Sequence, residues 1–188
     1  NMNKKSLRKL YKEKRFELSS KEVESISKTI RLQLVGHFDF SKKLVNVFLP
    51  IQRFNEIDLT PLVDEIIKND GEICLNKADF KTNTITPYLY SETSEIRVNS
   101  YGIPEPHQGI IVQNKEIDYV IVPLLAFDNK GFRVGYGKGF YDNFLALCSK
   151  ECIFIGVNHF NDGSNIDDIG NHDISLDYII TPEKINKF

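Results

Sequence analysis

The chain of 188 residues is 41% hydrophobic and 27% charged, which is typical of a globular protein that can bury one core. Its formal net charge of −2 gives no overall attraction for nucleic acids or membranes, so any anion site must be local. No apolar stretch approaches the roughly 18 residues of a membrane span, and no signal peptide is recognisable.

The three cysteines, Cys74, Cys148 and Cys152, are an odd number and show no metal-binding spacing. Free thiols are the rule in reducing compartments, so we expect a cytoplasmic protein. The sequence contains no sustained heptad pattern and no unexplained apolar stripe, which favours a monomer. We expect residues 1–188 to form a single domain.

The segment 4–18 has the periodicity of a basic amphipathic helix. Most of its cations are expected to be solvated. Lys4 and Arg8 are four residues apart, so they share one helix face and can both contact the same anion. A second helix is predicted to begin after Ser19, which forms a capping box with Glu22, and to end near His37.

Strands and helices then alternate along the chain. Strands are predicted at 44–49, 72–75, 84–89, 119–123, 153–157 and 178–181. Helices are predicted after Thr60, which is expected to be the cap, and at 140–149. This order predicts an α/β, Rossmann-like fold: a mostly parallel sheet with helices on both faces, preceded by an N-terminal helix pair. Pro87 places its strand at a sheet edge.

Glu56 lies in the loop that follows the first predicted strand. Sheets of α/β proteins bind ligands at the carboxyl ends of their strands, so Glu56 is a candidate ligand contact. Composition alone leaves a solvated loop glutamate equally open.

The stretch 122–142, VPLLAFDNKGFRVGYGKGFYD, contains four of the eleven glycines. Because an apolar strand leads in and a helical pattern leads out, we expect a strand-to-helix turn whose backbone N–H groups can approach an anion. Arg133 and Lys138 supply a planar fork and a point charge, a pairing common around phosphate. A P-loop would need Ser or Thr at Gly139, and a dinucleotide fingerprint would need glycine at Phe140. A plain glycine-rich hairpin remains the alternative.

The sequence offers no obvious nucleophile, because no Ser-His-Asp or Cys-His arrangement is evident. A phosphate-binding turn, several cations and scattered aspartates suit phosphoryl transfer with magnesium. Asp173 ends a long polar loop, 158–173, and could equally be a turn residue or a helix cap.

The glycine-rich stretch closely resembles the signature of the 5-formyltetrahydrofolate cyclo-ligases, also called 5,10-methenyltetrahydrofolate synthetases. The family pattern Pro-x-x-Ala-Phe-Asp, then Gly-x-Arg-hydrophobic-Gly-x-Gly-x-Gly-aromatic-Tyr-Asp, is matched in order from Pro123 to Asp142. Two other segments resemble the family: Lys4 and Arg8 match its Lys-x-x-x-Arg opening, and residues 102–106 resemble its Gly-Ile-x-Glu-Pro segment.

The resemblance implies a ligase that forms a carbon–nitrogen bond. Its small-molecule substrates would be ATP and 5-formyltetrahydrofolate, its cofactor magnesium, and its products 5,10-methenyltetrahydrofolate, ADP and phosphate. The formyl oxygen would attack the γ-phosphate, the second nitrogen of the folate would close the ring, and phosphate would leave.

The resemblance also implies the site residues. Arg133 and Lys138 would be catalytic and stabilise charge on the transferring phosphoryl group, and Asp142 and Asp173 would hold magnesium. ATP would contact Lys4, Lys5, Ser6, Leu7, Arg8, Arg133, Val134, Gly135, Tyr136, Gly137, Lys138, Gly139, Phe140 and Tyr141. The folate would contact Ile51, Glu56, Tyr136, Gly137, Lys138, Gly139 and Phe140, with Pro50 as the alternative to Ile51.

Two other functions stay open on the sequence. A non-catalytic nucleotide-binding regulator would keep the phosphate turn and lose the folate pocket; Glu56 argues against it only through the resemblance. A sugar-phosphate isomerase-like enzyme would need a catalytic carboxylate or histidine beside the turn, and no histidine lies between His107 and His159.

Overall fold

The computed structural model describes residues 1–188, and its centre is a seven-stranded sheet in the order β11-β10-β9-β6-β1-β2-β3. The five inner strands are parallel: β10 (Tyr178–Ile180), β9 (Ile153–Val157), β6 (Tyr119–Pro123), β1 (Leu44–Val47) and β2 (Glu72–Asp79). The edge strands β3 (Thr84–Leu89) and β11 (Ile185–Lys187) are antiparallel to their neighbours. The predicted mostly parallel sheet is confirmed, with Pro87 on an edge strand.

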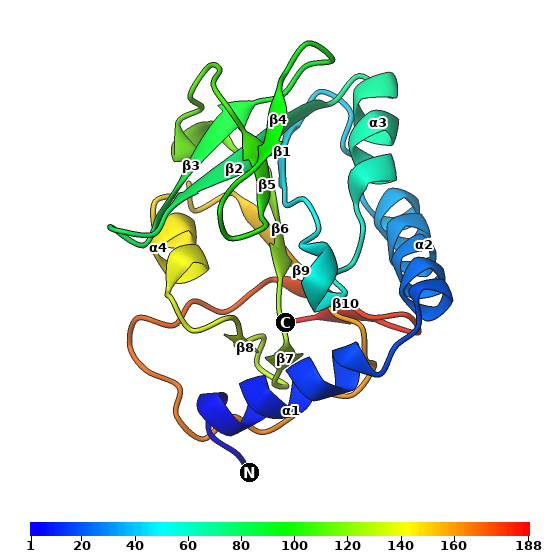
Figure 1. Cartoon of the computed structure of the whole chain (residues 1–188), viewed down its shortest axis with the longest axis vertical. Helices are drawn as coiled ribbons and strands as arrows, with labels where there is room; N and C mark the ends of the chain where they lie inside the picture. The colour runs from blue at the N-terminus through cyan, green and yellow to red at the C-terminus, as the bar shows by residue number, and fades with distance from the viewer.

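Helices cover both faces of the sheet, as predicted. In Figure 1, α2 (Ser20–His37) and α3 (Thr60–Lys68) lie along one side and α4 (Phe140–Ala146) lies on the other. The remaining helix, α1 (Lys4–Phe16), crosses one end of the molecule. No helix in the structure is both long and apolar enough to cross a membrane.

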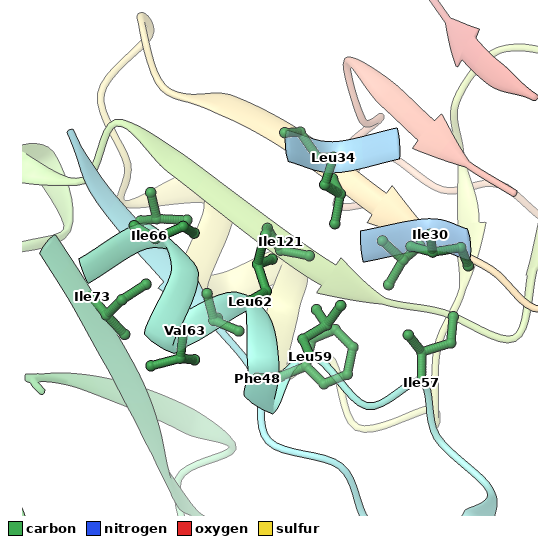
Figure 2. Close-up of a cluster of buried hydrophobic side chains, with 14 of the residues drawn as sticks. Ile30, Leu34, Phe48, Ile57, Leu59, Leu62, Val63, Ile66, Ile73 and Ile121 are labelled. Carbon is green, nitrogen blue, oxygen red and sulfur yellow. The ribbon is translucent and has the colours of Figure 1, made fainter. Parts of the chain in front are cut away.

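The larger core lies between the sheet and the two helices α2 and α3. Figure 2 shows Ile30 and Leu34 of α2 and Leu62 of α3 near Ile121 of β6, all essentially inaccessible to solvent. The other face buries Val120 of the same strand together with residues of α4. Because both faces of the inner strands are covered, β6, β9 and β10 have largely apolar sequences. Each buried aliphatic side chain contributes about 1.5–3 kcal/mol to folding.

Side-chain hydrogen bonds to backbone N–H groups mark where α2 and α3 begin. The capping box is present: Ser19 Oγ accepts from Glu22 N at 3.1 Å, and Glu22 Oε1 accepts from Ser19 N at 3.1 Å. The prediction that Thr60 caps α3 is wrong by one residue, because Thr60 is the first helical residue. Asp58 Oδ1 accepts from Thr60 N at 2.9 Å, so the carboxylate two residues earlier takes the role of the expected hydroxyl.

The two N-terminal helices are present, but α1 does not pack against α2 as a pair. Leu7 and Tyr11 of α1 are buried against the short hairpin formed by β7 (Ala126–Phe127) and β8 (Arg133–Val134). The polar loop 158–173 lies beside the segment that leads into α1, and Asp167 N donates to Met2 O there at 3.0 Å. These contacts bring the chain's first helix to the carboxyl ends of the central strands.

Three other elements complete the fold. A second hairpin pairs β4 (Ile96–Val98) with β5 (Pro104–Pro106), so the expected ordered turn at 101–106 forms its tip and returning strand. Two short 3-10 helices, η1 (Gln52–Phe54) and η2 (Asn114–Glu116), follow β1 and precede β6.

Candidate active site

A cavity of about 560 Å³ lies at the carboxyl ends of β1 and β6. Its walls come from α1, the η1 loop, β2, the β4–β5 hairpin and the turn between β8 and α4. This is the edge of a parallel sheet at which α/β proteins bind ligands. Segments far apart in sequence therefore meet where the sequence predicted a site.

The glycine-rich segment forms a turn, but the β7–β8 hairpin is inserted between β6 and that turn. Gly137 and Gly139 have φ angles of 94° and 73°, in the left-handed region that disfavours side chains. Arg8 of α1 lies against this turn, and its Nε donates to Gly135 O at 2.8 Å. A Cβ atom at residue 137 would come within 3.0 Å of Arg8 Cζ.

Replacing Gly137 with Ala should therefore disturb Arg8 as well as the backbone. We expect Gly137→Ala and Gly139→Ala each to lower the free energy of unfolding by about 1–2 kcal/mol, because both positions have positive φ. A Cβ at residue 139 meets no atom within 4 Å, so Gly137→Ala should weaken the ATP binding that the family resemblance implies more than Gly139→Ala does. Urea unfolding and titration calorimetry with ATP measure the two effects. Equal losses of ATP affinity would contradict the expectation that Arg8, which lies against the turn, contacts ATP.

Six cations line the cavity, and four of them come from α1 and the glycine turn. Lys4, Arg8 and Lys12 follow each other at four-residue intervals on one face of α1, and Lys138 faces them from the glycine turn. Lys12 Nζ lies 5.4 Å from the centroid of the Tyr136 ring, and burial, followed by the charges of Arg8 and Arg15, lowers the pKa of Lys12. Such crowding of positive charge stabilises a bound polyanion.

Two carboxylates face these cations. Asp142 Oδ1 accepts from Arg133 Nη2 and from Ile174 N, each at 3.1 Å. Asp173 Oδ2 pairs with Lys4 Nζ and accepts from Gly170 N at 2.7 Å. Burial opposes the charge of Asp173, but the Lys4 and Gly170 hydrogen bonds outweigh it and lower its pKa. The structure thus brings together the two predicted magnesium ligands.

The donor set fits magnesium. Asp142 and Asp173 both line the cavity, and the second oxygen of each makes no hydrogen bond within the protein. Magnesium is bound in many phosphate sites by one or two carboxylates together with substrate phosphates. No third histidine, cysteine or acidic side chain joins the pair, so phosphate oxygens and water would complete the coordination.

Arg133 and Lys138 differ in their surroundings. Arg133 is 9% exposed, and its two terminal nitrogens donate to Ile174 O at 2.8 Å and to Asp142. Lys138 is exposed at the cavity and forms no ion pair or hydrogen bond. Arg133 therefore fixes the carboxylate of Asp142, whereas the ammonium group of Lys138 is free to contact a negatively charged ligand.

Glu56 closes another part of the cavity and is 5% exposed. Its Oε1 accepts from Tyr136 OH at 3.0 Å. Burial raises the pKa of Glu56 to about 7, although the positive charge of Arg15 and hydrogen bonds from Tyr136 and Ile51 oppose the rise. The carboxyl group is thus near its ionisation midpoint at neutral pH.

Aromatic rings form an apolar wall that the sequence predicts only in part, because it places Phe140 and Tyr136 there but none of the other rings. The Phe80 and Tyr101 rings stack with centroids 4.2 Å apart, and Phe140 meets Phe80 edge-on at 5.1 Å. Phe54 and Tyr136 stack at 5.3 Å on another side of the cavity. Flat heterocyclic rings bind well between such surfaces.

Most of the residues proposed from the sequence reach the cavity, and four do not. Lys5 and Ser6 are exposed elsewhere on α1, and Leu7 and Val134 are buried in the small core beneath it. Lys12 continues the spacing of Lys4 and Arg8, so helical periodicity could have identified it. Only the tertiary structure reveals Arg53, Phe54, Phe80 and Tyr101 as further lining residues.

This fold and site are typical of an α/β enzyme with its cavity at the carboxyl ends of parallel strands. The cations and carboxylates suit a polyanionic ligand, and the aromatic wall with one buried acid suits a ligand with flat rings.

Comparison with known proteins identifies the family. Residues 1–182 match the model of the 5-formyltetrahydrofolate cyclo-ligase family. The chain is 32% identical to the 5-formyltetrahydrofolate cyclo-ligase of Mycoplasma genitalium over 157 residues, covering 83% of this chain and 84% of that protein. It is 27% identical to the mouse (Mus musculus) enzyme over 157 residues, covering 79% of this chain and 76% of the mouse protein. The chain therefore belongs to the 5-formyltetrahydrofolate cyclo-ligase family.

Solved structures agree. The NMR structure of Aquifex aeolicus 5,10-methenyltetrahydrofolate synthetase has a TM-score of 0.81 and 32% identity, covering 99% of this chain and 93% of that one. A 5,10-methenyltetrahydrofolate synthetase from Mycoplasma pneumoniae has a TM-score of 0.75 and covers 96% and 99%; at 24% identity it supports the fold.

Proposed function

We propose that this chain uses ATP and magnesium to cyclise 5-formyltetrahydrofolate to 5,10-methenyltetrahydrofolate, releasing ADP and phosphate. The observation that carries the proposal is the juxtaposition, in one cavity, of a cation-lined glycine turn and an aromatic-walled space that ends at Glu56. Family membership supplies the reaction class. We propose that residues 1–188 act as one domain, as a monomer and, consistent with three free cysteines, in the cytoplasm.

The triphosphate would bind along α1 and the glycine turn. Lys4 and Arg8 would contact its phosphates from the helix, and the backbone N–H groups of residues 135–139 would contact them from the turn. Asp142 and Asp173 would hold magnesium, which neutralises phosphate charge when bound. Arg133 keeps Asp142 in position for this role.

The folate rings would lie against the aromatic wall with the pterin directed at Glu56. A pterin presents an amino group and a ring N–H side by side, and a carboxylate can accept from both. Phe140 and Tyr136 would contact the rings, and Ile51 adds apolar surface beside Glu56. Holding both substrates in one cavity supplies the orientation that a reaction between them requires.

The chemistry needs no protein nucleophile. The formyl oxygen attacks the γ-phosphorus, the bond to the leaving ADP oxygen breaks, and an imino-phosphate forms. The second folate nitrogen then attacks the activated carbon and loses its proton to water, and the carbon–oxygen bond breaks as phosphate leaves. Lys138 would stabilise the negative charge on the transferring phosphoryl group, because no other side chain holds its ammonium group.

Near-ultraviolet absorbance tests the proposal, because the methenyl product absorbs there and the formyl substrate does not. Protein, 5-formyltetrahydrofolate, magnesium and ATP should produce the band, and omission of ATP should abolish it. ATP binding without any band would favour the regulator, and turnover of a sugar phosphate without ATP would favour the isomerase-like enzyme.

A further inference from the structure

One buried cation has no part in the proposed reaction. Arg15, in the last turn of α1, is 3% exposed although it carries a permanent charge. Its Nη1 donates to Tyr136 OH at 2.9 Å, and its Nη2 donates to Leu124 O. Burying a guanidinium is costly unless a partner benefits from its charge, so the position of Arg15 requires a reason.

The hydrogen bonds around Tyr136 have a fixed direction. A guanidinium can only donate, so the Tyr136 oxygen accepts from Arg15. Its single proton is therefore directed to Glu56 Oε1, 3.0 Å away. The result is a relay from a buried cation through a phenol to the buried carboxylate of the cavity.

The same helix end also holds the backbone beside Glu56. Asn55 adopts a left-handed conformation with φ of 50°, and its Nδ2 donates to Arg15 O at 2.8 Å. Asn55 O lies 2.6 Å from His159 Nε2, and because a carbonyl only accepts, His159 must donate there. Residues on both sides of the loop thus fix where Glu56 points.

Arg15 is the cation best placed to act on the Glu56 charge. Among the nearby groups, burial and then the charge of Arg15 lower the pKa of His159 to about 3, so His159 is neutral. Tyr136 and Tyr141 are also neutral, because burial raises the pKa of each phenol. Lys12 and Arg53 line the cavity but are more exposed than Arg15, so solvent screens them more. Arg15 is the leading influence that favours the ionised form of Glu56 against burial.

We propose that Arg15 is a positioning residue for the folate: through Tyr136 it keeps the Glu56 carboxylate charged and aimed into the cavity, ready to accept the pterin N–H groups. The proposal rests on the proposed function, because it names how the folate-binding end of that site is maintained. It adds to α1 a second role, at the opposite end of the helix from Lys4.

The pH dependence of folate affinity tests the proposal. Dissociation constants of 5-formyltetrahydrofolate are measured by calorimetry from about pH 6 to 9, a range in which Glu56 titrates. Wild-type affinity should fall on the acid side, below about pH 7. We call this fall in affinity at low pH the acid limb. In Arg15→Gln the midpoint of the acid limb should rise by about one pH unit or more, the usual effect of losing a close opposite charge. Affinity would then be about tenfold weaker near pH 6 and nearly normal near pH 9.

Two further variants keep the test decisive. Tyr136→Phe removes only the relaying hydroxyl and should move the limb in the same direction, so it serves if Arg15→Gln does not fold. Lys9→Gln removes an exposed charge from the same helix and should leave the limb unchanged.

The outcomes separate the inference from the function. Weaker binding by the same factor at every pH, or an unmoved limb in the folded variants, would overturn the role of Arg15. A wild-type protein that binds no 5-formyltetrahydrofolate at any pH would contradict the proposed function instead.

Discussion

Lys138→Ala should lower kcat by about 10²–10³-fold, the usual loss when one preorganised charge-stabilising group is removed. Lys138 faces the cavity from the glycine turn and has no protein partner, so its ammonium group is free to bind the transferring phosphoryl group. The variant should fold normally, because it removes no internal contact. Initial rates of methenyl formation at saturating ATP and 5-formyltetrahydrofolate measure the effect.

Lys130→Ala is the matched control. Lys130 is an exposed lysine on the neighbouring β7–β8 hairpin and does not line the cavity, so its removal should leave the rate unchanged. A Lys138→Ala enzyme with a near-normal kcat would remove Lys138 from the chemistry. Arg133→Ala is a less specific test, because it would also leave Asp142 without its ion pair.

Glu56→Gln should weaken the binding of 5-formyltetrahydrofolate by about 10²-fold or more. Two charge-assisted hydrogen bonds, each worth about 1.5–3 kcal/mol, would lose the charged acceptor. ATP affinity should change little, because Glu56 shares no hydrogen-bond partner with Asp142 or Asp173, the carboxylates proposed for magnesium. Calorimetric titrations with each substrate separate the two effects, and parallel losses for both would contradict the assignment of Glu56 to the folate.

Although Glu56→Gln should weaken folate binding, it should increase the stability of the folded protein at neutral and higher pH. The folded-state pKa of Glu56 is raised from 4.5 to about 7, so the buried carboxyl favours the protonated folded protein. Its contribution to stability is present at acid pH and is lost as pH rises from about 4.5 through 7. The loss corresponds to roughly 3 kcal/mol.

Denaturant unfolding at pH 5 and pH 8 measures this effect. Glutamine does not titrate, so Glu56→Gln should gain stability relative to wild type by up to roughly 3 kcal/mol between the two pH values. A difference between the two proteins that is the same at both pH values would mean that Glu56 is not held in a desolvated site.

Much of the fold was predictable because local signals and the global structure agree. The largely apolar sequences of β6 and β9 marked strands covered on both faces, and the Ser19 capping box marked the start of α2. The small hairpin β7–β8 was missed because its strands have only two residues each, too short for any periodicity. Strand β11 has three residues at an edge and is equally unmarked.

The charged half of the site could be predicted better than the apolar half. Cations and glycines lie close together in sequence, and Lys4 and Arg8 are related by simple helix spacing. Phe80 lies in the β2–β3 hairpin and Tyr101 in the separate β4–β5 hairpin, and only the tertiary packing of these hairpins brings their rings together. Arg15 looked like one more solvated cation of a basic helix, and nothing in the local pattern distinguishes it from Lys14. Its burial follows from the packing of α1 on β7–β8.

The ratio of phosphate released to methenyl product formed tests the proposed reaction most directly. With 5-formyltetrahydrofolate and magnesium ATP present, one phosphate should appear for each ring closed, and omission of either substrate should stop both. Equal release of phosphate without the folate, or ring closure without ATP, would contradict the coupling of the two substrates in this cavity.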